Sequence, residues 1–204
     1  AKNGSYGGKP HRFVIVRKTV LIPTKAGKLE IEPLEMEITA GVPIGRRDFF
    51  GNMLMNDVNF TLTSGKRTIR VKELPVEGKP FNFSGAVGDF EFSVTPSKTE
   101  LKSNESAQIK VELKGQGNLK LVQLPGIETS NGLEVYDPEH KENIKTTLNG
   151  LSGSVYDQYA VVPLSRGKFK IPGVSFSYFN PKEGKYHSVD TAPIMLNALS
   201  GVEL

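Results

Sequence analysis

The residues of this sequence that could perform chemistry are few and far apart. The histidines His11, His140 and His187 share no ligand spacing, whereas a zinc site requires His or Cys in close pairs. The stretch HSVD (187–190) contains His, Ser and Asp, but adjacent strand residues point to opposite faces, and a catalytic triad converges from separated segments. Cysteine is absent, which excludes disulfides and thiolate catalysis. These patterns predict a protein that is not an enzyme and that holds no metal or cofactor of its own.

Glycine-rich and acidic stretches add no catalytic pattern. The stretches SGAVG (84–88) and GQG (115–117) are not followed by a helix whose N-terminus would hold a phosphate, so we interpret them as a hinge and a turn. Asp137, Glu139 and Glu142 share a polar stretch, which does not hold two carboxyls at the fixed separation that acid–base catalysis requires. We interpret this stretch as a solvated loop.

The composition is that of an ordinary globular protein. The chain has 204 residues, of which 37% are hydrophobic and 24% charged, and no apolar stretch is long enough to span a membrane. Its N-terminus lacks the apolar core of a signal peptide. The net charge of +4 is spread over alternating acidic and basic residues, without the basic stripe of a nucleic-acid-binding protein. We therefore expect no nucleic-acid partner.

Alternation of apolar and polar residues predicts an all-β protein. In DFEFSVTP, for example, Phe90, Phe92 and Val94 share one face of a strand. Short strands separated by turn residues are typical of an immunoglobulin-like β-sandwich. A tight hairpin is expected at SRGK (165–168), with Gly167 supplying a positive φ. The predicted strands are 89–95, 107–114, 118–124, 133–136, 152–164, 168–179 and 185–198.

An internal repeat suggests a second, truncated sandwich. The stretch IPTKAGKLEIEPLEMEI (22–38) returns as VPLSRGKFKIPGVSFSY (162–178), early in the chain the first time and late the second. The expected organisation is the C-terminal part of one sandwich, a linker and a complete immunoglobulin-like sandwich. The chain would then be a piece of a longer protein, and exposed edges of the truncated sheet could pair with another copy. The expected boundaries are 1–75 (strands 12–23, 28–38 and 60–74), 76–83 and 84–204.

One segment of the first domain has no counterpart in the second copy. It spans residues 39–59 and is predicted to be an insertion loop that carries Arg46, Arg47, Phe49 and Phe50. Aromatic residues, Met and Arg are enriched at the centres of protein interfaces, and long loops are often functional. The loop is therefore a candidate partner contact. The alternative is that its phenylalanines cover the open end of their own sandwich.

Four stretches together form a specific combination: RRDFFG, LPVEGKPFNFSGAVGDFEFSVTPSKTELKSNESAQIKVELKGQGNLKLVQLPGI, GLEVYDPE and GSVYDQYAVVPLSRGKFKIPGVSFSYFNPKEGKYHSV. They resemble the BatD family of bacterial aerotolerance-operon proteins. The resemblance implies an exported, non-enzymatic protein of several sandwich domains, tethered at the periplasmic face by a membrane anchor. The implied partners are von Willebrand A-domain and tetratricopeptide-repeat proteins of the same operon.

The resemblance also suggests how loop carboxylates could be used. Von Willebrand A domains often bind a partner carboxylate through a divalent ion, and Asp137 or Glu139 could provide that group. The stretch DTA (190–192) resembles an O-glycosylation site of some bacterial exported proteins, which would modify Thr191. The alternative function is a carbohydrate-binding or adhesion-type sandwich. That function favours exposed Trp or Tyr platforms, and the sequence has no Trp.

Overall fold

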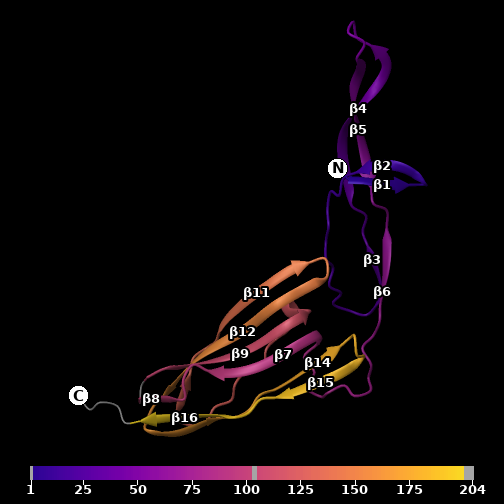
Figure 1. Cartoon of the computed structure of the whole chain (residues 1–204). Coiled ribbons are helices and arrows are strands. Elements are labelled where there is room, and N and C mark those ends of the chain that lie inside the picture. Colours follow the sequence, from indigo (N-terminus) through magenta and orange to yellow (C-terminus); the bar gives the residue numbers. More distant parts are fainter. Residues whose placement is uncertain (1, 103–104, 200–204) are drawn as a thin grey trace. The chain divides into compact units, whose positions relative to one another are not determined.

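The computed structural model describes residues 2–102 and 105–199, and among these residues it is all-β without an α-helix (Figure 1). The chain forms two compact units, each of which is described by itself. One unit contains the residues up to Ile22 together with those from Pro75 onward. The other contains Pro23–Leu74.

The first unit is built on two sheets and a small hairpin. The larger sheet has the strand order β10-β12-β9-β7-β14-β15, and β11 also pairs with β12. The smaller sheet has the order β13-β16-β8, and the hairpin is formed by β1 and β2. The strands are β1 (Lys2–Tyr6), β2 (Lys9–Phe13), β7 (Ala86–Pro96), β8 (Glu100–Lys102), β9 (Ala107–Gly117), β10 (Leu133–Val135), β11 (Glu139–Thr147), β12 (Gly150–Pro163), β13 (Gly167–Ile171), β14 (Ser175–Asn180), β15 (Lys185–Asp190) and β16 (Ile194–Leu199).

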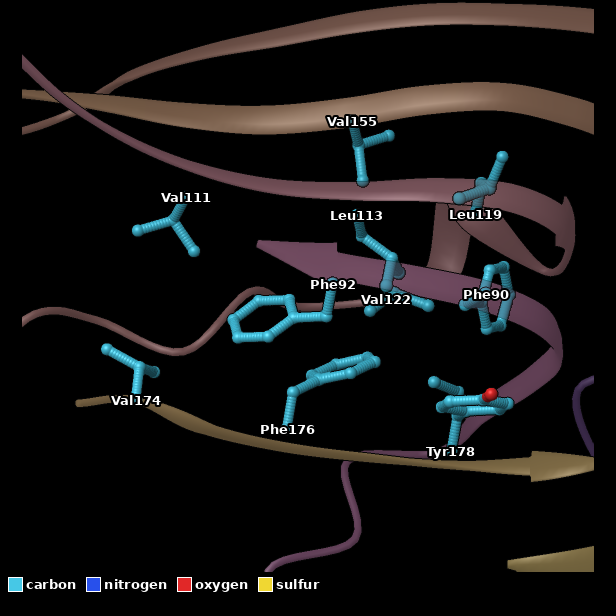
Figure 2. Close-up of a cluster of buried hydrophobic side chains, with 11 residues drawn as sticks. Phe90, Phe92, Val111, Leu113, Leu119, Val122, Val155, Val174, Phe176 and Tyr178 are labelled. Carbon is cyan, nitrogen blue, oxygen red and sulfur yellow. The ribbon is translucent and has the colours of Figure 1, made fainter. Parts of the chain in front are cut away.

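Aromatic side chains that alternate along two strands form the centre of the core. Phe90 and Phe92 of β7 are buried against Phe176 and Tyr178 of β14 (Figure 2). The Phe92 and Phe176 rings are stacked with their centroids 4.9 Å apart, and the Phe90 and Tyr178 rings meet edge to face at 5.6 Å. Because β7 and β14 are also parallel neighbours in the larger sheet, this sheet curls until its own inner faces meet. Each buried ring contributes about 1.5–3 kcal/mol through burial.

A second buried cluster connects the two sheets. Val94, Ile127 and Tyr159 lie against both clusters, so the core is continuous through the sandwich. The members of the second cluster are Leu101, Ala107, Ile109, Leu133, Val161, Phe169, Ile171, Ile194, Leu196 and Ala198.

Two glycines allow neighbouring strands of the larger sheet to approach closely where β7, β9 and β12 lie side by side. Gly115 of β9 lies between Phe90 of β7 and Gly153 of β12. A Cβ on Gly115 would lie 2.1 Å from the carbonyl oxygen of Asp89, and one on Gly153 would lie 2.0 Å from that of Asn143. Both glycines also have a positive φ, +149° and +141°. Other residues are therefore excluded by strain as well as by space.

The unit Pro23–Leu74 contains one long two-stranded ribbon. The β3–β6 and β4–β5 ladders share a single register from Gly27↔Val71 to Pro43↔Met55, so they are successive parts of one antiparallel pair. The strands are β3 (Gly27–Ile31), β4 (Glu35–Arg47), β5 (Met53–Thr63) and β6 (Arg67–Val71).

The sequence repeat is also a structural repeat. In the sandwich, β13 and β14 pair with β16 and β15 in a single register, from Gly167↔Ala198 to Asn180↔Lys185. β3 begins at the glycine that matches the first residue of β13, and β4 begins at the residue that matches the start of β14. Each copy therefore consists of a strand, a short break and a second strand. Both strands pair antiparallel with a second segment that is itself two strands separated by a break.

The same two hydrogen bonds close the break in both copies. In the ribbon, the Ser64 N–H donates to the Leu34 carbonyl at 2.9 Å, and the Leu34 N–H donates to Ser64 Oγ at 2.9 Å. In the sandwich, the Thr191 N–H donates to the Val174 carbonyl at 3.0 Å, and the Val174 N–H donates to Thr191 Oγ1 at 2.9 Å. A hydroxyl side chain thus replaces a missing ladder bond at equivalent positions, which satisfies an N–H that would otherwise lack a partner.

The break moves the apolar side chains to the other face of each ribbon. Before it the apolar residues of β3 have odd numbers, and after it those of β4 have even numbers. The four residues concerned match core residues of the sandwich, yet they are only half-buried in the ribbon. The matching residues are Leu29 and Phe169, Ile31 and Ile171, Met36 and Phe176, and Ile38 and Tyr178.

The predicted all-β sandwich is confirmed, but two predicted strands are wrong. The 118–124 segment contains the short 3₁₀ helix η1 (Leu119–Leu121), and Leu119 and Val122 are both buried in the core. The alternation of Leu119, Lys120 and Leu121 resembles a strand, but in the 3₁₀ turn Leu121 is exposed and the buried side chains are three residues apart. The predicted 12–23 strand continues beyond Phe13 as irregular chain, because no strand among the described residues pairs with it.

Other boundaries also differ from the sequence prediction. The segments 168–179 and 185–198 each contain two strands, which lie in different sheets. The SRGK turn is not a hairpin, because β12 and β13 also belong to different sheets. The short β8 and the polar β11 were not predicted. The division into 1–75, 76–83 and 84–204 stays a prediction.

We predict that Gly115→Ala destabilises the sandwich by about 2 kcal/mol or more, because the new Cβ would collide with the Asp89 carbonyl at a positive φ. Denaturant unfolding measures the difference. The matched control is Gly126→Ala, whose Cβ would meet only the Tyr159 hydroxyl at an ordinary 3.7 Å. Equal stability of the two variants would contradict the close approach of β7 and β9.

We predict that Thr191→Val lowers the free energy of unfolding by about 1–2 kcal/mol, because the part-buried Val174 N–H loses its acceptor. Ser64→Ala removes the equivalent bond where the Leu34 N–H is exposed to water, so its cost is smaller. The comparison uses thermal and denaturant unfolding of both variants. A larger loss for Ser64→Ala would show that the two breaks are not equivalent.

Candidate functional site

A hairpin arm extends beyond the repeated part of the ribbon. β14 and β15 have six residues each, whereas β4 has 13 and β5 has 11. The extra length, residues 41–57, is the arm. The predicted insertion loop over 39–59 is therefore wrong as a loop, because most of that segment is paired strand. Gly41, Pro43 and Gly45 interrupt the alternation, and such residues ordinarily argue against a strand interior.

The tip of the arm is a turn held by one carboxylate. Asp48 Oδ1 accepts the N–H groups of Phe50 at 2.9 Å and Asn52 at 2.8 Å. The Asn52 side-chain amide donates to Asp48 Oδ2 at 3.1 Å, and the Gly51 N–H donates to the Asp48 carbonyl at 3.0 Å. The hydrogen bonds from the backbone and side chain of Asn52, followed by that from the Phe50 N–H, lower the pKa of Asp48. Asp first and Gly fourth are the preferred residues of a type I turn.

The turn presents two phenylalanines to solvent. The exposed fractions of Phe49 and Phe50 are 98% and 85%. Their rings lie edge to face with centroids 5.7 Å apart. A phenylalanine stabilises a fold when its ring is buried, and neither of these rings is buried against the described chain. Their exposed apolar surface therefore adds nothing to the free energy of unfolding.

The two arginines of the arm differ in their contacts. Arg47 donates from Nη1 to the Gly51 carbonyl at 2.9 Å, so it supports the turn. Arg46 is exposed and forms no hydrogen bond or ion pair with the described residues. Exposed apolar side chains continue from the tip along the arm, which gives it the composition of an interface centre. These side chains are Val42, Ile44, Met53, Leu54 and Met55.

The acidic candidates lie in the other unit. Asp137 is exposed between β10 and β11, and Glu139 at the start of β11 forms an ion pair with Lys141 at 3.0 Å. The structure therefore does not bring them together with the arm in one compact unit. Within residues 2–102 and 105–199 no three His, Cys, Asp or Glu side chains are grouped so that they could hold a metal.

The histidines also show structural contacts. His140 lies opposite Asp157 on β12, with Nδ1 and Oδ1 2.6 Å apart. The hydrogen bond to Asp157 raises the pKa of His140. His187 stacks on Tyr178 and contacts Glu183 at 2.9 Å. These contacts stabilise strands at the edge of the sandwich.

Comparison with protein families decides the relationship. The family model for the BatD DUF11 like domain matches residues 94–198, which is the sandwich from the end of β7 to β16. The chain belongs to the BatD family. BatD proteins are an aerotolerance-related family of exported proteins. The match does not include the arm, so the arm's role has to be argued from its own geometry.

Two further comparisons add no relative. No curated protein and no solved structure matches the chain. We also find no helical segment in the described part of the chain with the length and hydrophobicity of a membrane span.

We predict that the tip turn loosens only at low pH. The pKa of Asp48 is lowered by the turn, so its stabilisation is present above the ordinary Asp pKa and is lost as the pH falls through the lowered value. The amide signals of Phe50 and Asn52, followed by NMR between neutral and acidic pH, report the change. In Asp48→Asn the same signals should show no transition in that range, and an unchanged wild-type-like titration would contradict the assignment.

Proposed function

We propose that this protein is a non-enzymatic interaction module of the Bat-type aerotolerance machinery. The sandwich serves as a scaffold at the periplasmic face of the membrane, and the arm contacts a protein partner. The supporting observation is the pair Phe49 and Phe50, which are exposed to solvent on a turn held by six hydrogen bonds among residues 47–52. Such preorganisation reduces the entropy that a partner must overcome on binding.

The chemistry of the tip favours a protein partner over a sugar. Sugar rings stack on a flat aromatic face, whereas the planes of Phe49 and Phe50 are 88° apart and form no common platform. Phenylalanine also has no hydroxyl or N–H to bond with sugar hydroxyls. Two such rings instead suit an apolar pocket in a partner, and Arg46 suits a carboxylate at its rim.

The partners that we propose are the von Willebrand A-domain and tetratricopeptide-repeat proteins of the same operon. For the first of these, a carboxylate such as Asp137 or Glu139 could also bind through the partner's divalent ion. The two modes are separable, because only the second depends on a metal. Tethering of the protein to the membrane is part of this proposal.

We predict that Phe49→Ala and Phe50→Ala each weaken binding to the partner domain about 30-fold, as expected for aromatic residues that carry interface energy. Stability should change by less than about 0.5 kcal/mol, because both rings are exposed. Calorimetric titration with the purified von Willebrand A domain, and separately with the tetratricopeptide-repeat domain, measures the affinities.

The matched control is Phe81→Ala, which removes a fully exposed phenylalanine outside the arm and should leave the affinity unchanged. A chelator separates the two modes, since binding through the arm persists without divalent ions. Unaltered affinity of both arm variants, or loss of binding only with chelator and in Asp137→Asn or Glu139→Gln, would contradict the arm as the contact.

A further inference from the structure

The smaller sheet has a cationic depression on its outer face. The side chains of β13, β16 and β8 alternate, so that the buried ones enter the core and the others face solvent. An open cavity of about 710 Å³ lies at one end of this face. Its volume falls within the range of small-molecule sites. It is lined by Lys102, Arg166, Gly167, Lys168, Asn197, Ala198 and Leu199.

Strand pairing brings the cations of this cavity together from three separate parts of the sequence. Lys168 of β13 lies opposite Asn197 of β16, and Lys102 of β8 lies opposite Leu199 of β16. Neighbouring strands are spaced about 4.8 Å apart, and Asn197 and Leu199 are two residues apart at about 3.3 Å per residue, so the two lysine backbones lie roughly 12 Å apart. Their long side chains can reach one ligand placed between them. Arg166 precedes β13 in the turn and lines the same cavity.

Lys102, Arg166 and Lys168 form no salt bridge with a carboxylate of the described residues. The pKa of Glu105 is lowered mainly by its hydrogen bond to the Lys98 side chain, and the Lys102 charge adds a smaller contribution. The nearest acid to Lys102 in sequence, Glu105, is occupied, since it bonds the Lys98 side chain and accepts the Lys102 backbone N–H at 2.9 Å. Glu100 lies on the same outer face opposite Asn197, but it does not line the cavity.

The concentration of positive charge is not a property of the sandwich as a whole. From Pro75 onward acidic residues outnumber basic ones. Three unpaired cations in one depression therefore represent a local segregation of charge, which attracts an anion with more than one negative charge. A single carboxylate would need only one of them, whereas phosphate oxygens accept hydrogen bonds from Arg and Lys at once.

We infer that the depression lined by Lys102, Arg166 and Lys168 is a binding site for a phosphate group. The group could belong to a free phosphate ester or to a lipid headgroup, since both present the same oxygens. The site lies in the sandwich and does not depend on the arm or on the function proposed for it.

The test titrates the ¹⁵N-labelled chain with inorganic pyrophosphate and follows the amide signals of Gly167 and Ala198. Saturable shifts at these residues are expected. Arg166→Ala and Lys168→Ala should each weaken binding about tenfold, because each removes one charge-assisted contact. Glu100→Gln should tighten binding by a few fold, since it removes the one acid on this face.

The matched control is Lys145→Ala, which removes an unpaired, exposed lysine from β11 in the other sheet and should leave the affinity unchanged. Equal weakening by this variant would show general attraction of anions and would overturn the site.

A second experiment distinguishes a free phosphate ester from a lipid headgroup. Vesicles of phosphatidylcholine alone are compared with vesicles that also contain phosphatidylglycerol, using co-sedimentation of wild type, Arg166→Ala and Lys145→Ala. Retention on the anionic vesicles that is lost only in Arg166→Ala supports a headgroup, and pyrophosphate binding without vesicle retention supports a free ester. Absence of both interactions would overturn the inference.

Discussion

The sandwich depends on a break in its paired strands that is bridged by a side-chain hydroxyl, between Val174 and Thr191. We call this the hydroxyl-closed break. A two-stranded ribbon buries one face, so a continuous ribbon could serve only one layer of a sandwich. At Thr191 the ladder is interrupted without a change of register, and a side-chain oxygen satisfies the Val174 N–H. The apolar side chains thereby change face, and the same ribbon contributes β13 and β16 to one sheet and β14 and β15 to the other.

The first copy contains the same hydroxyl-closed break, but its apolar side chains are less buried. Ser64 and Leu34 reproduce the two bonds, and the apolar residues again change from one face to the other. These residues are half-buried where their counterparts Phe176 and Tyr178 are buried. The apolar pattern of the core thus extends through the first copy as well. The arm lies outside that pattern, because it begins where the repeated strands end.

Much of the sandwich could be predicted because its strands are buried on one face. Phe90, Phe92 and Val94 show the period of two directly. β11 could not be found in this way, because an exposed edge strand such as EHKENIKTT carries no apolar alternation. Leu119 and Leu121 misled the prediction, since they alternate with Lys120 as in a strand, whereas the 3₁₀ turn buries Leu119 and exposes Leu121.

The candidate functional residues were predictable to different degrees. Phe49 and Phe50 became candidates because aromatic residues, Met and Arg are enriched at the centres of protein interfaces. The turn around Asp48 was missed, although Asp followed three residues later by Gly is a turn signal. The cationic depression could not be read from the sequence, because Lys102 lies far along the chain from Arg166 and Lys168, and only strand pairing brings them together.

We propose that the arm provides the main contact with the partner, ahead of the carboxylates of the sandwich. The most direct measurement is an NMR titration of the ¹⁵N-labelled chain with the unlabelled von Willebrand A domain of an operon neighbour. The account predicts that amide signals of residues 47–52 shift or broaden first, while those of β7, β9 and β12 stay in place. Changes confined to the sandwich, with the signals of the tip unaltered at saturation, would contradict it.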